Sequence, residues 1–374
     1  MPKISSRPFG GSWRTGRPDE HPHRQAQRHR RRDPHATLAR SPAPLLPGGA
    51  HQLGRRGSGL GFAGRSPDAR PGPHLAAEAL GPRPPGGGNR AAVLREIREF
   101  LRTLRDRPYD LVIDFHGLFK SAVVVFLSGG RRRLGYDSLQ EGSGLFLNEK
   151  IPEDMTRHAV DRYLDFPRHL GCDASNPVFP IAVTGAHVKR VQDLLAAQSV
   201  DTTAGFVAIS PVAYWETKLW DEARFAAVCD RIVRELGLPV VFTGEMSEGP
   251  IERIRSLMRA PSASVAGATT LRELAALYRQ ASVLLTTDSG PMHLAAAVGT
   301  PVVALFGPTS PERTGPYGAG HAVIRKGLTC SPCFRKSCET MECMKAIGVD
   351  EVFRAVRDRI EQAGRGKHSE IRGR

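Results

Sequence analysis

The stretch SVLLTTDSGPMHLAAAVGTPVVALFGPTSPERTGPY, residues 282–317, decides the fold of this chain. It opens with an apolar run, Val283–Leu285, of the length of a buried parallel strand. A short helix is predicted next, with Ser289 at the N-cap position and Gly299 just beyond its end. A second apolar run, Val302–Phe306, predicts the following strand. Such a strand–helix–strand unit is the repeating element of a doubly wound parallel sheet.

The start of this helix predicts an anion-binding site. A helix N-terminus offers unpaired N–H groups and the positive end of the helix dipole, which suit a pyrophosphate. Asp288 precedes the N-cap, and His293 lies in the first turn, where it would stand beside the anion as a donor. The plain alternative is that Asp288 and Ser289 only cap the helix and that His293 is a solvated helix residue.

Strands and helices alternate through the second half of the chain. The predicted strands are 206–210, 239–243, 263–266, 283–285 and 302–306, and the predicted helices are 221–236, 250–258, 271–280 and 292–298. This alternation is typical of a parallel sheet with helices on both faces. Ligands of such sheets bind beyond the carboxyl ends of the strands, so one crevice is expected to collect Lys218, Glu248, Asp288 and His293.

The first half shows the same alternation from residue 91 onward. Its predicted elements are a helix at 91–105, a strand at 111–115, a helix at 118–127, a strand at 131–136 and a helix starting at 157. We therefore divide the chain into four parts: an anomalous segment 1–90, the remainder of a first Rossmann-like domain 91–186, a second Rossmann-like domain 200–348, and a C-terminal helix with a basic tail, 349–374.

The formal net charge of +15 is concentrated at the start of the chain. Residues 1–90 hold 16 Lys and Arg against 5 Asp and Glu, whereas the remaining residues hold 37 against 33. The basic excess therefore says little about the partner of residues 91–374, which lack the aromatic–basic interleaving of nucleic-acid-binding surfaces. We expect no nucleic-acid partner.

Residues 1–90 also have an anomalous composition, with 15 Arg but one Lys and almost no hydrophobic periodicity. One interpretation is a disordered basic arm. The interpretation we favour is a GC-rich gene translated in the wrong frame. Reading the codons of residues 21–37 one nucleotide later permits ILIVKLSAIGDVIHTLP, a buried strand followed by a Gly-Asp turn and a helix. The codon of Arg31 then supplies the Asp, and ordinary reading resumes near residues 86–91.

The whole set of motifs resembles glycosyltransferase family 9, the heptosyltransferases of the lipopolysaccharide inner core. The resemblance covers about residues 91–360. It is carried by T217-K218-x-W220, G244-x-x-x-E248, D288-S289-G290-P291-x-H293-x-A295, F306-G307-P308-T309, D114-x-H116-G117-L118-x-K120-S121, R132-x-x-G135 and C330-x-x-C333-x4-C338-x4-C343-M344. No single motif would suffice, but together they are specific.

This resemblance implies an α/β enzyme of the GT-B class, with two Rossmann-like domains, the first of them incomplete here. The implied donor is ADP-heptose, bound mainly by the second domain, and the implied acceptor is the lipid-anchored lipopolysaccharide core. No metal is required for the transfer. No signal peptide or long apolar run occurs, so we expect a cytoplasmic protein with peripheral contact at the inner membrane.

The donor site is expected to contain Thr217, Lys218, Glu248, Asp288, Ser289, Gly290 and His293. Lys218 and Asp288 are the candidate catalytic residues, because a compact ammonium group suits the charge that develops on a leaving diphosphate. Asp288 either orients the heptose or holds His293. A carboxylate at Glu248 suits a ribose or sugar hydroxyl, although Glu245 and Glu252 are near enough to substitute for it.

The acceptor side and the catalytic base are less well marked. His116, Lys120 and Arg132 either line the acceptor site or are solvated surface residues. An inverting transfer needs a base, and the resemblance attributes that role to an Asp in the Gly-Asp turn after the first strand. The chain as written has no such residue, so we expect the literal polypeptide to be inactive.

The six cysteines fall into two groups. Cys172 and Cys229 are far apart and are predicted to be small apolar core residues. Cys330, Cys333, Cys338 and Cys343 have the spacing of a small zinc site, and the alternatives are reduced thiols or a pair of disulfides.

Two other functions remain open from the sequence. One is a GT-B transferase or epimerase that uses a different sugar nucleotide, such as a UDP sugar. The other is a basic nucleic-acid-binding protein, suggested only by the Arg-rich start.

Overall fold

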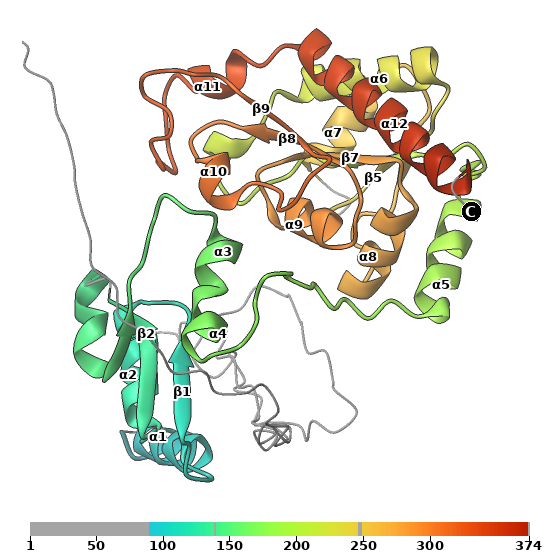
Figure 1. Cartoon of the computed structure of the whole chain (residues 1–374). Coiled ribbons are helices and arrows are strands. Elements are labelled where there is room, and N and C mark those ends of the chain that lie inside the picture. The colour runs from blue at the N-terminus through green and yellow to red at the C-terminus, as the bar shows by residue number, and fades with distance from the viewer. Residues whose placement is uncertain (1–89, 138–139, 246–248, 373–374) are drawn as a thin grey trace, which may run out of the picture. The chain divides into compact units, whose positions relative to one another are not determined.

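The computed structural model describes residues 90–137, 140–245 and 249–372 (Figure 1). The segment to which the reading-frame hypothesis applies, and the candidate residue Glu248, lie outside these ranges. No helix in the described ranges is both long and apolar enough to cross a membrane.

The second half of the chain forms a six-stranded sheet in which every pairing is parallel. Its strand order is β6-β5-β4-β7-β8-β9. The strands are β4 (Val207–Ser210), β5 (Val240–Phe242), β6 (Ala263–Ser264), β7 (Val283–Thr287), β8 (Val302–Phe306) and β9 (Ala322–Arg325). The residues of β4, β5, β7 and β8 are all buried, as expected for strands covered on both faces.

Helices cover both faces of this sheet (Figure 1). They are α5 (Gly185–Ala196), α6 (Glu222–Leu236), α7 (Pro250–Leu257), α8 (Leu271–Gln280), α9 (Gly290–Ala297), α10 (Pro311–Thr314), α11 (Glu342–Lys345) and α12 (Val349–Arg372), with a 3-10 turn, η3, at Glu216–Lys218. Side chains alternate between the two faces along each strand. Val207 and Ile209 therefore join a cluster with α6, α7 and α12, whereas Ala208 joins one with α5, α8 and α9.

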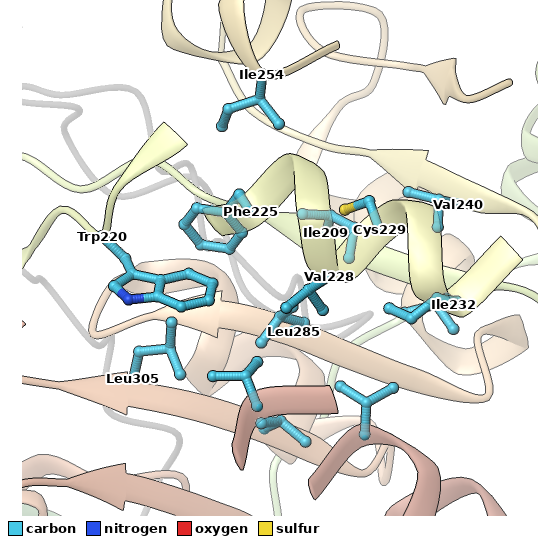
Figure 2. Packing of buried hydrophobic residues seen from close by; sticks show 14 of the residues in the cluster. Ile209, Trp220, Phe225, Val228, Cys229, Ile232, Val240, Ile254, Leu285 and Leu305 are labelled. Atoms are coloured by element: carbon cyan, nitrogen blue, oxygen red, sulfur yellow. The ribbon is translucent and has the colours of Figure 1, made fainter. Parts of the chain in front are cut away.

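The packing of α6 shows how the sequence places these helices. Its apolar residues recur at helical spacing, so Phe225, Val228 and Ile232 all face the sheet (Figure 2). Each is fully buried, which contributes about 1.5–3 kcal/mol per side chain. Asp221 caps the helix by accepting a hydrogen bond from the Arg224 N–H at 2.9 Å. The helix ends at Gly237, whose φ of 67° is left-handed.

The first half contains a smaller parallel sheet of order β1-β2-β3, with β1 at Leu111–Asp114, β2 at Arg132–Tyr136 and β3 at Glu149–Ile151. The accompanying elements are α1 (Arg90–Leu104), α2 (Phe119–Leu127), the 3-10 helix η2 (Gln140–Phe146), α3 (Ala159–Tyr163) and α4 (Asp165–His169). A small core of Leu134, Tyr136, Ile151 and Phe166 joins them.

One edge of this smaller sheet is poorly covered. Strand β1 lies at the edge, and Leu111, Val112 and Ile113 are only half-buried. On α1, the side chains of Val93, Leu94 and Ile97 remain 38%, 56% and 48% exposed. Apolar surface of this kind is normally buried against a neighbouring element. Within the described residues, this sheet therefore has three strands and leaves apolar surface on β1 and α1 partly uncovered.

Most of the predicted elements are confirmed, but the strands β3 and β9 and the helices α5, α10 and α11 were missed. Strands β3 and β9 are short and place only Ile151 and Ile324 in the interior, so they lack a clear apolar run. Helix α5 lies mostly between the two predicted domains, 91–186 and 200–348, in a stretch for which no element was predicted. The helix predicted from residue 157 is two short helices, α3 and α4, that meet at Leu164.

The two isolated cysteines have different environments. Cys229 is buried in the α6 interface, as predicted. Cys172 is exposed, so its assignment to the core was wrong. It directly follows Gly171, whose φ of 82° turns the chain away after α4.

Candidate active site

Three loops at the carboxyl ends of adjacent strands form the candidate site. The pairing of Ser210 with Thr286, and of Thr287 with Leu305, brings the ends of β4, β7 and β8 side by side. The loops that follow these strands are residues 211–220, 288–289 and 307–310. This edge is where parallel α/β sheets bind ligands.

An ion pair joins the first two loops. Lys218 Nζ lies 2.7 Å from Asp288 Oδ2, and the Asp288 side chain is only 6% exposed. The hydroxyl of Thr309, from the third loop, donates to the same oxygen at 2.6 Å. A buried carboxylate is stable only when it is paired and hydrogen-bonded. The structure thus brings together the two predicted catalytic residues, Lys218 and Asp288, and adds Thr309 as their partner.

The N-terminus of α9 opens next to Asp288. Ser289 is the N-cap residue, as predicted, but its side chain makes no capping hydrogen bond. Its hydroxyl donates instead to the Thr287 carbonyl at 3.3 Å. A methyl group added at Gly290 would meet no atom within 4 Å. The space beside Gly290 at the start of α9 is therefore open, which suits the approach of an anion.

His293 lies one turn into α9, as predicted. Desolvation by the surrounding protein is the main cause that lowers its pKa below the usual 6.5. The Asp288 carboxylate acts in the opposite direction, whereas His158 and Lys218 lower the pKa further. The residue is nevertheless solvent-exposed, although many protein atoms surround its imidazole ring. We conclude that His293 is mainly neutral at pH 7 and able to donate one N–H.

His158 is a residue that the sequence analysis missed. Its Nδ1 accepts a hydrogen bond from the Val160 N–H at 3.1 Å and caps α3. Nε2 must then carry the proton, and it donates to the Gly315 carbonyl at 3.1 Å. The ring also lies 5.0 Å from that of Tyr317. The available signal was a His directly before a short helix, which by itself indicates only a cap.

Thr217 and Trp220, from the T-K-x-W motif, hold the site together from behind. The Thr217 hydroxyl donates to the Arg335 carbonyl at 2.8 Å, and its side chain is buried. Trp220 is buried against Phe225, and its indole N–H donates to the Ile347 carbonyl at 3.2 Å. Through these hydrogen bonds, both residues attach the Lys218 loop to the C-terminal part of the domain.

The loop with the four late cysteines packs beside the site. The N–H groups of Cys333 and Phe334 donate to the Pro308 carbonyl at 3.0 and 2.8 Å. Cys330 and Cys338 are exposed, Cys333 and Cys343 are half-buried, and all four are free thiols. In the described ranges, no three or more His, Cys, Asp or Glu side chains have the geometry to hold a metal ion.

The candidate acceptor residues belong to the smaller sheet. Asp114 organises the turn after β1 by accepting hydrogen bonds from the N–H groups of His116 and Gly117 at 2.9 and 3.1 Å. The side chains of His116 and Lys120 are exposed. Arg132 forms two hydrogen bonds of 2.8 Å with Glu149. Within the described residues, no contact connects His116, Lys120 or Arg132 with the Lys218–Asp288 pair.

The two substitutes for Glu248 have different surroundings. Glu252, in α7, pairs with Arg255 at 2.9 Å. Glu245 follows β5 and is exposed. Of these two carboxylates, Glu245 is thus the one that Arg255 does not engage, so it is the better substitute for Glu248.

Residues 97–344 match the family model described as glycosyltransferase family 9 (heptosyltransferase). The chain is 26% identical over 221 residues to the lipopolysaccharide core heptosyltransferase OpsX of Haemophilus influenzae. This alignment covers 58% of this chain and 62% of that protein. It is 30% identical over 246 residues to lipopolysaccharide heptosyltransferase 1 of Pseudomonas aeruginosa, covering 65% of this chain and 67% of the relative. The match thus spans about two thirds of the length of these relatives.

Solved structures show the same fold. A family 9 glycosyltransferase from Veillonella parvula superposes with a TM-score of 0.62 at 24% identity, covering 74% of this chain and 81% of that one. The ADP-heptose lipopolysaccharide heptosyltransferase II of Escherichia coli gives a TM-score of 0.59 at 23% identity, with coverages of 72% and 82%. Together with the two parallel sheets, these similarities confirm the predicted α/β fold of the GT-B class. The chain belongs to glycosyltransferase family 9, the heptosyltransferase family.

Proposed function

We propose that this protein transfers heptose from ADP-heptose to the inner core of lipopolysaccharide. The proposal is supported by the family membership and by the heptosyltransferase names of the relatives. The observation that carries it is the Lys218–Asp288 ion pair of 2.7 Å beside the open N-terminus of α9. A half-buried cation next to a helix N-terminus is suited to a diphosphate.

The leaving group determines what this site has to do. When the sugar departs, negative charge grows on the nucleoside diphosphate, and fixed positive charge stabilises that transition state. The Lys218 ammonium group has three protons, so it can bind phosphate oxygens while it stays paired with Asp288. The N–H groups at the start of α9 add to this stabilisation. We propose that no metal ion is needed for the transfer.

Asp288 acts on Lys218 in this proposal. Its carboxylate accepts hydrogen bonds from both Lys218 and Thr309, so it fixes the direction of the ammonium group. The contacts of Asp288 favour this positioning role over direct contact with the heptose. His293 stands beside the same site as a donor to the phosphates, and it is mainly neutral before the nucleotide binds.

The acceptor half of the reaction depends on the reading frame. The base is proposed to be the Asp of the Gly-Asp turn that the corrected frame encodes at the codon of Arg31. The acceptor is lipid-anchored, so we propose peripheral contact of a cytoplasmic enzyme with the inner membrane. A nucleic-acid partner is not proposed, because the basic excess lies in residues 1–90.

Product analysis tests this function. The frame-corrected protein is mixed with ADP-heptose and a heptose-free core acceptor, and the products are identified by mass spectrometry. We expect ADP and an acceptor that is heavier by one heptose. Transfer from UDP-glucose in place of ADP-heptose would instead support the use of another sugar nucleotide. The Lys218→Met variant is the negative control for background hydrolysis.

A further inference from the structure

Two lysines share one aromatic ring at the edge of the candidate site. Lys218 Nζ lies 4.7 Å from the centre of the Trp215 ring, and Lys336 Nζ lies 5.6 Å from it. An ammonium group near an indole is attracted by the negative face of the ring. Lys218 already belongs to the proposed diphosphate site. Lys336 comes from the loop between β9 and α11, and no motif in the sequence pointed to it.

The backbone before Lys336 is fixed to the site by hydrogen bonds. The Arg335 carbonyl accepts from the buried Thr217 hydroxyl at 2.8 Å. The Phe334 N–H donates to the Pro308 carbonyl at 2.8 Å. Both partners lie on the loops that hold the Lys218–Asp288 pair. The position of Lys336 beside Trp215 is therefore set by the same loops that build the site.

The charges in this region leave Lys336 available for a ligand. The charge of Lys218 is balanced by Asp288. Among the ion pairs of the described residues, by contrast, none involves Lys336, and its side chain is exposed. A sugar nucleotide carries a negative charge on each phosphate, and the departure of the sugar adds another. One lysine that is already paired balances only part of this charge.

We propose that Lys336 is a second cation of the donor site and binds the diphosphate together with Lys218. The Trp215 ring is the neighbour that both ammonium groups share. This inference rests on the proposed function, because it assigns a further residue to the same donor site. Lys336 should bind the nucleoside diphosphate product most strongly, because the negative charge is greatest there.

The test measures nucleotide binding to the full chain by titration calorimetry. ADP and AMP are compared at low and high salt for the wild type and for Lys336→Met, Lys336→Arg and Lys345→Met. Lys345 is the matched control, because it is exposed in the neighbouring helix α11 and no cation–aromatic contact joins it to Trp215 in the described structure. Lys336→Met is expected to weaken ADP binding about tenfold, as for the loss of one charged contact.

The pattern across the variants separates a binding role from a structural one. AMP binding should change much less than ADP binding, the salt dependence of ADP binding should decrease, and Lys336→Arg should restore most of the affinity. Lys345→Met should bind ADP as the wild type does. If Lys336→Met binds ADP with wild-type affinity and salt dependence, the role of Lys336 is refuted while the proposed function stands.

Other nucleotides distinguish failure of the proposed function. If the wild type binds UDP or GDP instead of ADP, and Lys336→Met weakens that binding, the inference about Lys336 is supported and the ADP-heptose donor is not. If the wild type binds none of the three diphosphates, both proposals fail.

Discussion

Lys218 Nζ and Asp288 Oδ2 lie 2.7 Å apart, and the side chains are 17% and 6% exposed. The two residues come from loops after β4 and β7, which are neighbours in the sheet. A pair buried to this degree links the stability of the domain to the function of its site. Substitution of one residue leaves the charge of the other buried without a partner.

A double-mutant comparison separates these two effects. Lys218→Met should lower the free energy of unfolding by about 3 kcal/mol, because it leaves the Asp288 carboxylate buried beside Thr309 alone. Adding Asp288→Asn should recover much of that loss. In the frame-corrected protein, the transfer rate should fall about a hundredfold or more in both variants, since neither has the cation. Urea unfolding and ADP release measure the two quantities, and recovery of activity in the double mutant would contradict the role of Lys218.

Substitution of Gly290 tests whether the start of α9 receives the ligand. A Cβ atom added at this exposed position would meet no atom within 4 Å, so we expect Gly290→Val to change the unfolding free energy by less than about 0.5 kcal/mol. The valine would nevertheless occupy the space in front of the helix, and ADP binding should weaken at least about tenfold. Gly185→Val is the matched control, because Gly185 begins α5 and is equally open. Equal ADP affinity in the two variants would refute the site.

Protonation of His293 should accompany ADP binding. Desolvation holds the pKa of the free residue below 6.5, and a phosphate beside the ring would raise it. At a pH between these two values, binding therefore takes up a proton. Calorimetry near pH 6 in buffers of different ionisation enthalpy measures this uptake. The His293→Gln variant should lose it, whereas an unchanged uptake in that variant would place the proton elsewhere.

Removal of metal ions should leave the transfer rate unchanged. The proposed stabilisation of the diphosphate uses Lys218 and the N-terminus of α9, so dialysis against EDTA should have no effect. Loss of activity that Mg²⁺ restores would overturn this expectation. Metal analysis of the same sample also tests the late cysteines, and stoichiometric zinc retained by wild type but not by Cys333→Ser would show a metal site there.

Correction of the reading frame should complete the smaller sheet. Strand β1 is at the edge, and Leu94 and Ile97 on α1 are 56% and 48% exposed, so added strands have apolar surface to cover. We expect the corrected protein to unfold at higher urea concentration and the amides of β1 to exchange more slowly. It should also transfer heptose, whereas the literal chain should not. Equal exchange of the β1 amides in both proteins would contradict this prediction.

The sequence alone predicted the alternation of strands and helices, because buried parallel strands are continuous apolar runs and their helices have caps at both ends. The run Val302–Phe306 and the helix Leu271–Gln280 were predicted with their observed bounds. Short elements with few buried residues, such as β9, carry too little pattern to be recognised. The motif residues Lys218 and Asp288 were also identified from sequence, as charged residues in loops after strands.

Only the tertiary structure decided how those residues are used. The pairing of Lys218 with Asp288, the hydrogen bond from Thr309, and the position of Lys336 beside Trp215 join segments that are far apart in the chain. The alternation of strands and helices predicted one crevice at the carboxyl ends of the strands, but it carries no information on which side chains of these loops pair with each other. The strand order β5-β4-β7-β8 sets these neighbours, and it follows from the packing of the whole sheet.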